Sequence, residues 1–203
     1  GLLFIAGTGV DLVTNAHAAG SRADALVVVG LGGDKAHDEA LVGAATTIAT
    51  GLRQKFGYGD RLVLLTEYGP GNPGVDGISD AAGIRSALMR FSKEAVEEDR
   101  LLVVLIGHSS GERDYWRLNI PGGDLSATDW RDILSSYPGA AGIVVAAPAA
   151  ANLSKVLAGP KRIVISSTRP SEIRTWAFLD VLAEILGPAE EEETAEKPKT
   201  LWD

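Results

Sequence analysis

Short apolar runs recur along the chain, at residues 25–30, 61–66, 101–106, 143–147 and 162–167. They are rich in Val, Leu and Ile and end at glycine, proline or polar residues, which is typical of β-strands. The run at 101–106 contains no polar residue. A strand without polar alternation indicates burial on both faces, as in a parallel sheet.

Between these runs, apolar residues recur at helical spacing. Ile84, Leu88 and Phe91 form one such stripe. Ser126 and Asp129 resemble a capping box, which marks the start of a further helix. The spacing predicts helices at residues 38–56, 81–96, 126–136, 153–157 and 171–186.

Strands and helices therefore alternate along the chain, which predicts βαβ units with right-handed crossovers. We expect an α/β fold, a three-layer sandwich in which a mostly parallel sheet carries helices on both faces. This domain is expected to span residues 21–187, after an N-terminal arm at 1–20. The tail at 188–203 is acidic and poor in apolar residues, so we expect it to be disordered.

The central run ends in the first candidate functional residues. Gly107 and His108 follow it directly, and then come Ser109, Ser110 and Gly111. Open α/β sheets place their ligands at the carboxyl ends of strands. Any chemistry of this protein is therefore expected near His108.

A glycine-rich turn at residues 30–33 suggests a nucleotide site, because it follows the first strand and precedes a helix. A dinucleotide-binding fingerprint requires a third glycine where this chain has Lys35. Glycines that allow a tight strand-to-helix turn are the simpler interpretation. A nucleotide-binding α/β protein is accordingly the third hypothesis.

Residues 107–111 also match G-x-S-x-G, the nucleophile elbow of α/β-hydrolases. In that family a separate histidine later in the chain serves as the base, and this chain has no histidine after His108. The elbow also leads directly into a helix, whereas residues 112–120 are predicted to be extended. An esterase-like serine hydrolase that uses Ser109 and His108 is the second hypothesis.

The order of the strands and their endings resembles the caspase and legumain-like cysteine peptidases, which share the caspase-hemoglobinase fold. In that family the dyad histidine follows the third core strand and the cysteine follows the fourth. Here Gly107 and His108 end the third apolar run, and residues 143–150 fall where the family has an apolar run, Ala, Cys, any residue, Ser and Gly. The resemblance covers roughly residues 25–186 and implies a caspase-like topology.

The resemblance places Ala147 at the position of the catalytic cysteine, with Ala149 and Ala150 at the following Ser and Gly. The chain contains no cysteine, and a methyl group cannot replace a thiolate nucleophile. The implied protein is a pseudo-peptidase, a kind found among bacterial relatives of the family. If this holds, His108 and Ala147 lie within side-chain reach across neighbouring strand ends.

A binding or scaffold module is therefore the first hypothesis, rather than an enzyme. We expect a peptide or a partner protein at the former active-site edge, with Gly107, Ser110 and Trp116 close to it. His and carboxylate residues nowhere show metal-ligand spacing. We therefore expect neither a metal nor a cofactor.

Charge and composition argue against several kinds of partner and site. The net charge is -8, so we expect no nucleic-acid partner. The absence of cysteine also excludes disulfides and thiolate zinc sites.

Residues 1–18 combine an apolar stretch with an Ala-x-Ala sequence and resemble the end of a secretory signal peptide. We expect a secreted or periplasmic protein if this interpretation holds, and a cytoplasmic one otherwise. No other stretch is long enough for a transmembrane helix, so we expect no stable membrane insertion of the domain.

Overall fold

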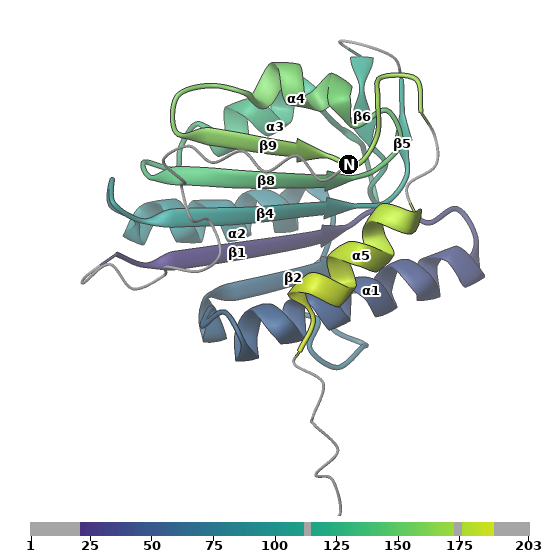
Figure 1. Ribbon diagram of the computed structural model, residues 1–203, viewed down its shortest axis with the longest axis horizontal. Coiled ribbons are helices and arrows are strands. Elements are labelled where there is room, and N and C mark those ends of the chain that lie inside the picture. Colours follow the sequence, from purple (N-terminus) through teal and green to yellow (C-terminus); the bar gives the residue numbers. More distant parts are fainter. Residues whose placement is uncertain (1–20, 112–114, 173–175, 189–203) are drawn as a thin grey trace, which may run out of the picture.

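The computed structural model describes residues 21–111, 115–172 and 176–188, which form a three-layer α/β sandwich (Figure 1). The main sheet comprises β1 (Ala23–Val29), β2 (Leu62–Thr66), β3 (Gly77–Ile78), β4 (Arg100–Ile106), β8 (Ala140–Ala146) and β9 (Arg162–Ser166). A small second sheet comprises β5 (Ser109–Ser110), β6 (Arg117–Leu118) and β7 (Leu125–Ser126). The helices are α1 (Lys35–Gln54), α2 (Ala81–Glu94), α3 (Ala127–Leu134), α4 (Ala151–Leu157), α5 (Trp176–Leu186) and the short 3-10 helix η1 (Gly59–Arg61).

The main sheet has the strand order β3-β2-β1-β4-β8-β9, and every pair in it is parallel. In the centre, Ala25 lies opposite Leu62 of β2 and Leu102 of β4. On the other side of β4, Ile106 lies opposite Ala146 of β8. Because the strands are parallel, their carboxyl ends all meet at one edge of the sheet, which confirms the predicted fold class.

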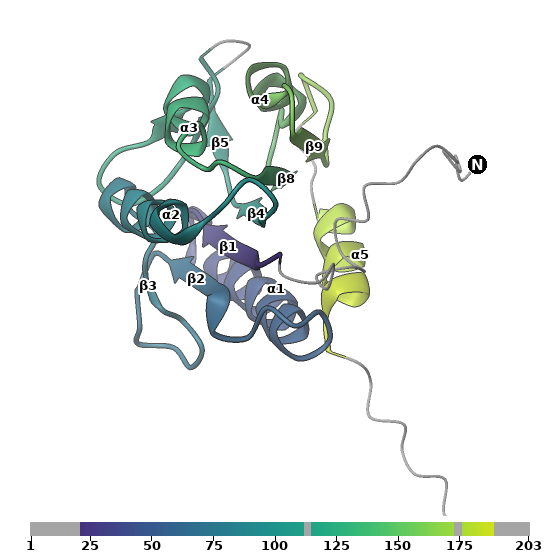
Figure 2. The same cartoon turned by 90° about the vertical axis from the view of Figure 1, so that its left-hand side faces the viewer.

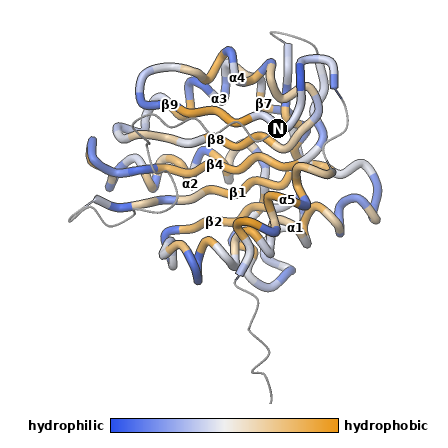
Figure 3. Tube along the Cα trace, viewed as in Figure 1, coloured by the Kyte–Doolittle hydropathy of each residue, from blue (hydrophilic) through white to orange (hydrophobic). Residues whose placement is uncertain are grey.

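Helices cover both faces of the sheet, as the view along the strands shows (Figure 2). One face packs against α1 and α5, and the other against α2, α3 and α4. Alternate residues of β1 enter the two cores: Leu26 and Val28 face α2, whereas Val27 and Val29 face α1. Both faces are buried, which explains the continuous hydrophobic colouring of the central strands in Figure 3 and the unbroken apolar runs in the sequence.

Element boundaries differ from the predictions by a few residues, since β8 begins at Ala140 rather than 143 and α1 at Lys35 rather than 38. β9 is an edge strand, and its Ile163 and Ile165 are 38% and 46% exposed. The capping box is confirmed, since the Ser126 hydroxyl accepts a hydrogen bond from the Asp129 amide and the Asp129 carboxylate accepts one from the Ser126 amide. The arm at 1–20 and the acidic tail from 189 onward lie outside the described residues.

Buried carboxylates organise the amino edge of the sheet. Asp24, near the start of β1, is fully buried and forms an ion pair with Arg61 at 2.5 Å. It also accepts a hydrogen bond from the Tyr137 hydroxyl at 3.3 Å. Burial raises the pKa of Asp24, and the charge and hydrogen bond of Arg61 oppose that shift. This cluster joins β1 to the segments that enter β2 and β8.

A second buried carboxylate, Asp99, lies directly before β4. It accepts hydrogen bonds from the amides of Arg22 at 2.7 Å and Val96 at 2.9 Å, and its Oδ2 lies 3.2 Å from the Arg22 guanidinium. Burial alone would raise the pKa of Asp99, but these bonds and the Arg22 charge outweigh burial and lower it. Glu94 approaches both Arg22 and Arg61, at 3.7 and 3.5 Å, and so connects the two clusters.

Candidate functional site

Backbone hydrogen bonds close the carboxyl edge of the sheet around His108. The Gly107 amide donates to the Ala146 carbonyl at 3.2 Å, and the His108 amide donates to the Leu31 carbonyl at 3.2 Å. The Asn119 amide in turn donates to the His108 carbonyl at 3.0 Å. The segments after β1, β4, β6 and β8 therefore form one connected layer, with His108 held through its backbone.

Two glycines permit this close approach. A Cβ at Gly30 would lie 2.4 Å from the Asn119 carbonyl oxygen. Gly107 has a φ of +144°, and a Cβ there would lie 3.1 Å from the Gly30 Cα. Close packing of the backbone therefore explains why both positions hold glycine. The predicted contact between Gly107 and a ligand stays a prediction.

The His108 side chain is exposed and turns toward α1. Its ring centroid lies 6.3 Å from that of His37, with the ring planes at 69° in an edge-to-face arrangement. His37 Nδ1 lies 2.6 Å from the Asp34 carboxylate. Hydrogen bonds from the His37 backbone and ring lower the pKa of Asp34. The His108 ring therefore lies beside the His37–Asp34 pair at the start of α1.

The alanine-rich segment after β8 folds into a loop that a threonine hydroxyl supports. Thr168 Oγ1 donates to the Ala147 carbonyl at 2.8 Å and accepts from the Ala150 amide at 2.9 Å. Ala149 has a φ of +49°, a left-handed conformation that is uncommon for residues other than glycine. Ala147 itself is fully buried in the core beneath α2, α3 and α4.

The Pro148 carbonyl brings further predicted residues together. The Ser109 hydroxyl donates to it at 2.6 Å, and the Trp116 indole N–H donates to it at 3.0 Å. Trp116 is fully buried, so it packs beneath the loop. Ser110 is exposed on β5, next to this cluster. The structure thus gathers the residues after β4 and β8 at one site.

His108 and Ala147 end neighbouring strands, yet their side chains lie on opposite faces of the sheet. Ile106 and Ala146 are paired and both face the α1 core. Side chains alternate along a strand, so Ala147 turns to the other core while His108 returns to the α1 face. The shared edge agrees with the expectation, and the orientation differs from the side-by-side arrangement that was expected.

No protein-family model matches this chain, and no curated protein matches it significantly. In the described parts of the chain, no group of three or more His, Asp or Glu residues is arranged to hold a metal ion. Within the same residues, no helix combines the length and apolar character needed to cross a membrane. The geometry of the carboxyl edge is therefore the basis for any functional conclusion.

Ser109 lacks the surroundings of a hydrolase nucleophile. It begins β5 and lies opposite Leu118 of β6 in an antiparallel pair. In the segment predicted to be extended, Arg117 and Leu118 form β6, and residues 112–114 lie outside the described residues. Its hydroxyl donates to the Pro148 carbonyl, and a carbonyl cannot activate a serine as a base does.

The turn after β1 is poorly suited to a phosphate. Asp34 caps α1 and accepts a hydrogen bond from the His37 amide at 3.0 Å. The Gly32 amide donates to the Asp38 carboxylate at 2.6 Å. Carboxylates thus occupy amides that a nucleotide phosphate would need, and their charge would repel it.

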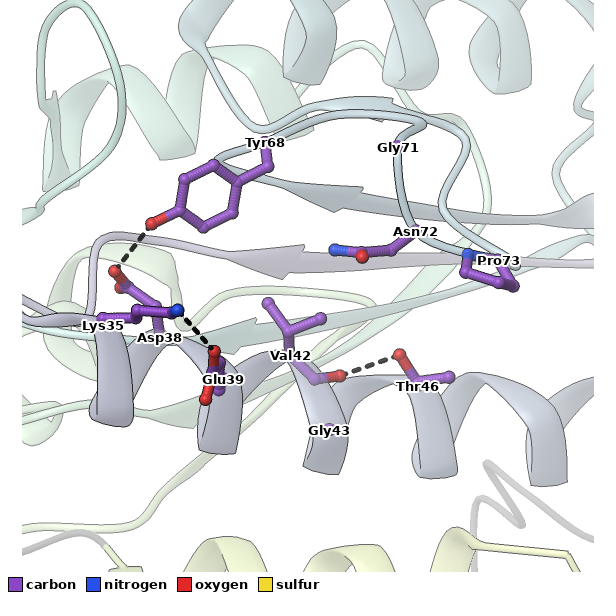
Figure 4. Close-up of a pocket in the computed structure, with 10 residues that line it drawn as sticks. All are labelled: Lys35, Asp38, Glu39, Val42, Gly43, Thr46, Tyr68, Gly71, Asn72 and Pro73. Atoms are coloured by element: carbon purple, nitrogen blue, oxygen red, sulfur yellow. Dashed lines mark hydrogen bonds and ion pairs between the residues drawn. The ribbon is translucent and has the colours of Figure 1, made fainter.

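A cavity of about 950 Å³ lies between α1 and the loop after β2, and no sequence motif indicated it (Figure 4). Its α1 residues recur at helical spacing on a face separate from the buried stripe that contains Leu41. The helical wall could therefore be recognised from the spacing of its residues, whereas the position of the opposing loop could not be predicted from the sequence. The lining residues are Lys35, Asp38, Glu39, Val42, Gly43, Thr46, Tyr68, Gly71, Asn72 and Pro73.

Proposed function

We propose that this chain is a catalytically degenerate caspase/legumain-like domain that binds a peptide or a partner protein at the carboxyl edge of its sheet. The main support is that the strand ending in Gly107 and His108 lies directly beside the strand that leads into Ala147. The chain has no cysteine, and the Ala147 methyl group is buried. A thiolate mechanism therefore has no nucleophile, which favours binding over proteolysis.

Exposed side chains at this edge supply groups that can hold a peptide. His108 and Ser110 are exposed, and Tyr115 is 75% exposed. An imidazole, a hydroxyl and a phenol can donate and accept hydrogen bonds, and the two rings add contact area at a low entropy cost. The closely bonded backbone beneath them gives the edge a fixed shape, which lowers the cost of binding.

A peptide-library experiment tests this function. A randomised peptide library is selected on the immobilised protein, and the affinity of the selected peptide is then measured by fluorescence polarisation. The substitutions His108→Ala and Tyr115→Ala are expected to weaken binding, each by about fivefold or more. Glu98→Ala, an exposed change at the amino edge, is the matched control and is expected to have no effect.

Two further measurements address catalysis. The protein is expected to release no product from fluorogenic peptide substrates. A serine-reactive fluorophosphonate is expected to leave it unlabelled, because the Ser109 hydroxyl donates to the Pro148 carbonyl rather than to a base. Labelling that disappears in Ser109→Ala would contradict the proposal in favour of the hydrolase hypothesis. If neither His108→Ala nor Tyr115→Ala weakens the binding of the selected peptides, binding at this edge would be contradicted.

A further inference from the structure

The cavity between α1 and the loop after β2 has one helical wall and one loop wall (Figure 4). Val42 and Thr46 lie along the helical wall, and Asn72 and Pro73 lie on the loop opposite. The Thr46 hydroxyl donates to the Val42 carbonyl at 2.8 Å, so its polar group is already satisfied. This end of the cavity therefore offers aliphatic contacts from Val42, Thr46 and Pro73 beside the Asn72 amide.

Each wall of the cavity contains a glycine, which has no side chain to occupy the space. A Cβ at Gly43, inside α1, would meet no atom within 4 Å, and the same holds for Gly71 in the loop. Packing therefore does not require glycine at position 43, although glycine is less favourable than alanine inside a helix. The missing side chain keeps the cavity open between Val42 and Pro73.

The other end of the cavity is negatively charged. Asp38 accepts hydrogen bonds from the Tyr68 hydroxyl at 3.0 Å and from the Gly32 amide at 2.6 Å. The hydrogen bond to Asp38, together with burial and the nearby charges of Asp38, Glu67 and Glu39, raises the pKa of Tyr68. Burial and the Asp38 charge also raise the pKa of Glu67. Carboxylates thus outnumber the one cation in the lining, Lys35, whose ammonium lies 3.7 Å from Glu39.

We propose that this cavity binds the basic side chain of a peptide, with its aliphatic stem along Val42 and Gly43 and its cationic group between Asp38 and Glu39. An arginine or lysine side chain combines these two parts, since its stem packs on apolar surface while its charge pairs with carboxylates. The exposed Tyr68 ring adds a face that attracts a cation. This inference goes beyond the proposed function, because the cavity lies on α1 and includes none of the residues after β4 or β8.

A peptide occupant fits the wide mouth of the cavity. The side chains of Lys35 and Glu39 at its rim are 89% and 70% exposed, and Tyr68 is 59% exposed. A peptide backbone can lie across such a rim while one side chain enters. The entering group meets the acidic end without losing its connection to the chain outside.

The test measures binding of a fluorescein-labelled Gly-Gly-Arg-Gly-Gly peptide by fluorescence polarisation. A matched peptide with norleucine in place of arginine keeps the stem and removes the charge. We expect the norleucine peptide to bind about tenfold more weakly or worse. Equal affinity for the two peptides would overturn the proposal.

Gly43→Leu places an isobutyl group in the part of the cavity proposed for the stem and keeps every charge of the protein, so it separates entry into the cavity from general attraction to an acidic surface. We expect it to weaken binding of the arginine peptide by about tenfold or more. Ala40→Leu, at an exposed position of α1 outside the cavity lining, is the matched control and is expected to bind as the parent chain does, with circular dichroism showing that both variants fold. Parent-like binding by Gly43→Leu would overturn this site and leave the carboxyl-edge proposal standing.

Discussion

Different interactions hold the amino edge and the carboxyl edge of the main sheet. At the amino edge, Asp24 and Asp99 are fully buried, and an arginine pairs with each. The Tyr137 hydroxyl also donates to Asp24, and backbone N–H groups donate to Asp99. At the carboxyl edge, His108 is exposed, and the segments are held by bonds between backbone groups. Buried charge therefore sets how the strands enter the sheet, while the other edge is held by backbone bonds together with neutral side chains such as those of Ser109, Trp116 and Thr168. The exposed side chains of His108 and Ser110 can face a ligand.

The largest expected loss of stability comes from a substitution at the amino edge. Asp24→Ala is expected to lower the free energy of unfolding by about 3 kcal/mol, because Arg61 keeps only its contact with the exposed Glu94 and the Tyr137 hydroxyl loses its acceptor. Urea denaturation measures this loss. Asp60→Ala, an exposed acid one residue before Arg61, is the control and is expected to change stability by less than about 0.5 kcal/mol. Equal losses in the two variants would show that the buried pair does not stabilise this edge.

The next effect tests how tightly the carboxyl edge is closed. Gly30→Ala would place a Cβ 2.4 Å from the Asn119 carbonyl and is expected to cost about 2–3 kcal/mol. Gly43→Ala adds the same methyl group where nothing lies within 4 Å, and it is expected to stabilise the protein by about 0.5–1 kcal/mol. Thermal unfolding of both variants gives the comparison. A similar change in Tm for the two variants would mean that the backbone around Gly30 is packed less tightly than the 2.4 Å distance indicates.

The pH dependence of stability sharpens the role of Asp99. Its native pKa is lowered, so its stabilising contribution is complete above its ordinary pKa of about 3.9 and is lost as the pH falls through the native value. Asp99→Asn places an amide against the Arg22 and Val96 N–H groups and is expected to cost about 1–2 kcal/mol near pH 6. Denaturation curves collected between about pH 6 and pH 2 should show the difference from the parent chain shrinking. A constant difference would contradict this role.

The smallest expected effect compares strained backbone at the two edges. Ala149 at the carboxyl edge and Lys161 at the amino edge have φ values of +49° and +60°. Ala149→Gly is expected to raise stability by about 0.5 kcal/mol, because relief of the left-handed conformation exceeds the entropy cost of glycine. Lys161→Gly also loses an ion pair with Glu97, so its gain should be smaller. A destabilised Ala149→Gly variant would show that the alanine methyl contributes more than the strain costs.

The apolar runs predicted the fold because most main-sheet strands are buried on both faces, and continuous hydrophobicity is the simplest pattern in a sequence. The two-residue strands β3, β5, β6 and β7 were not placed individually, since such short segments carry no periodicity. The capping box was visible because its two partners, Ser126 and Asp129, are three residues apart.

The candidate site was predicted only as far as strand ends could be aligned. His108, Ser109 and the alanine loop meet at the carboxyl edge because parallel strands end together. The contact between His108 and His37 depends on which face of the sheet the ring enters, and the sequence does not indicate that. The bond from Trp116 to Pro148 joins residues 32 positions apart, and the cavity on α1 depends on how a Gly- and Pro-rich loop packs. These are tertiary contacts with no local pattern.

Strand order also determines how the protein can assemble during synthesis. β1 lies between β2 and β4, so it gains its second neighbour only after the segment that begins at Arg100 has been synthesised. β4 joins β1 on the side away from β2, and β8 and β9 then join in turn on that same side. Growth of the sheet in the direction of translation leaves β4 briefly exposed as an apolar margin, and covering it is the step at which a nascent chain would most need a chaperone.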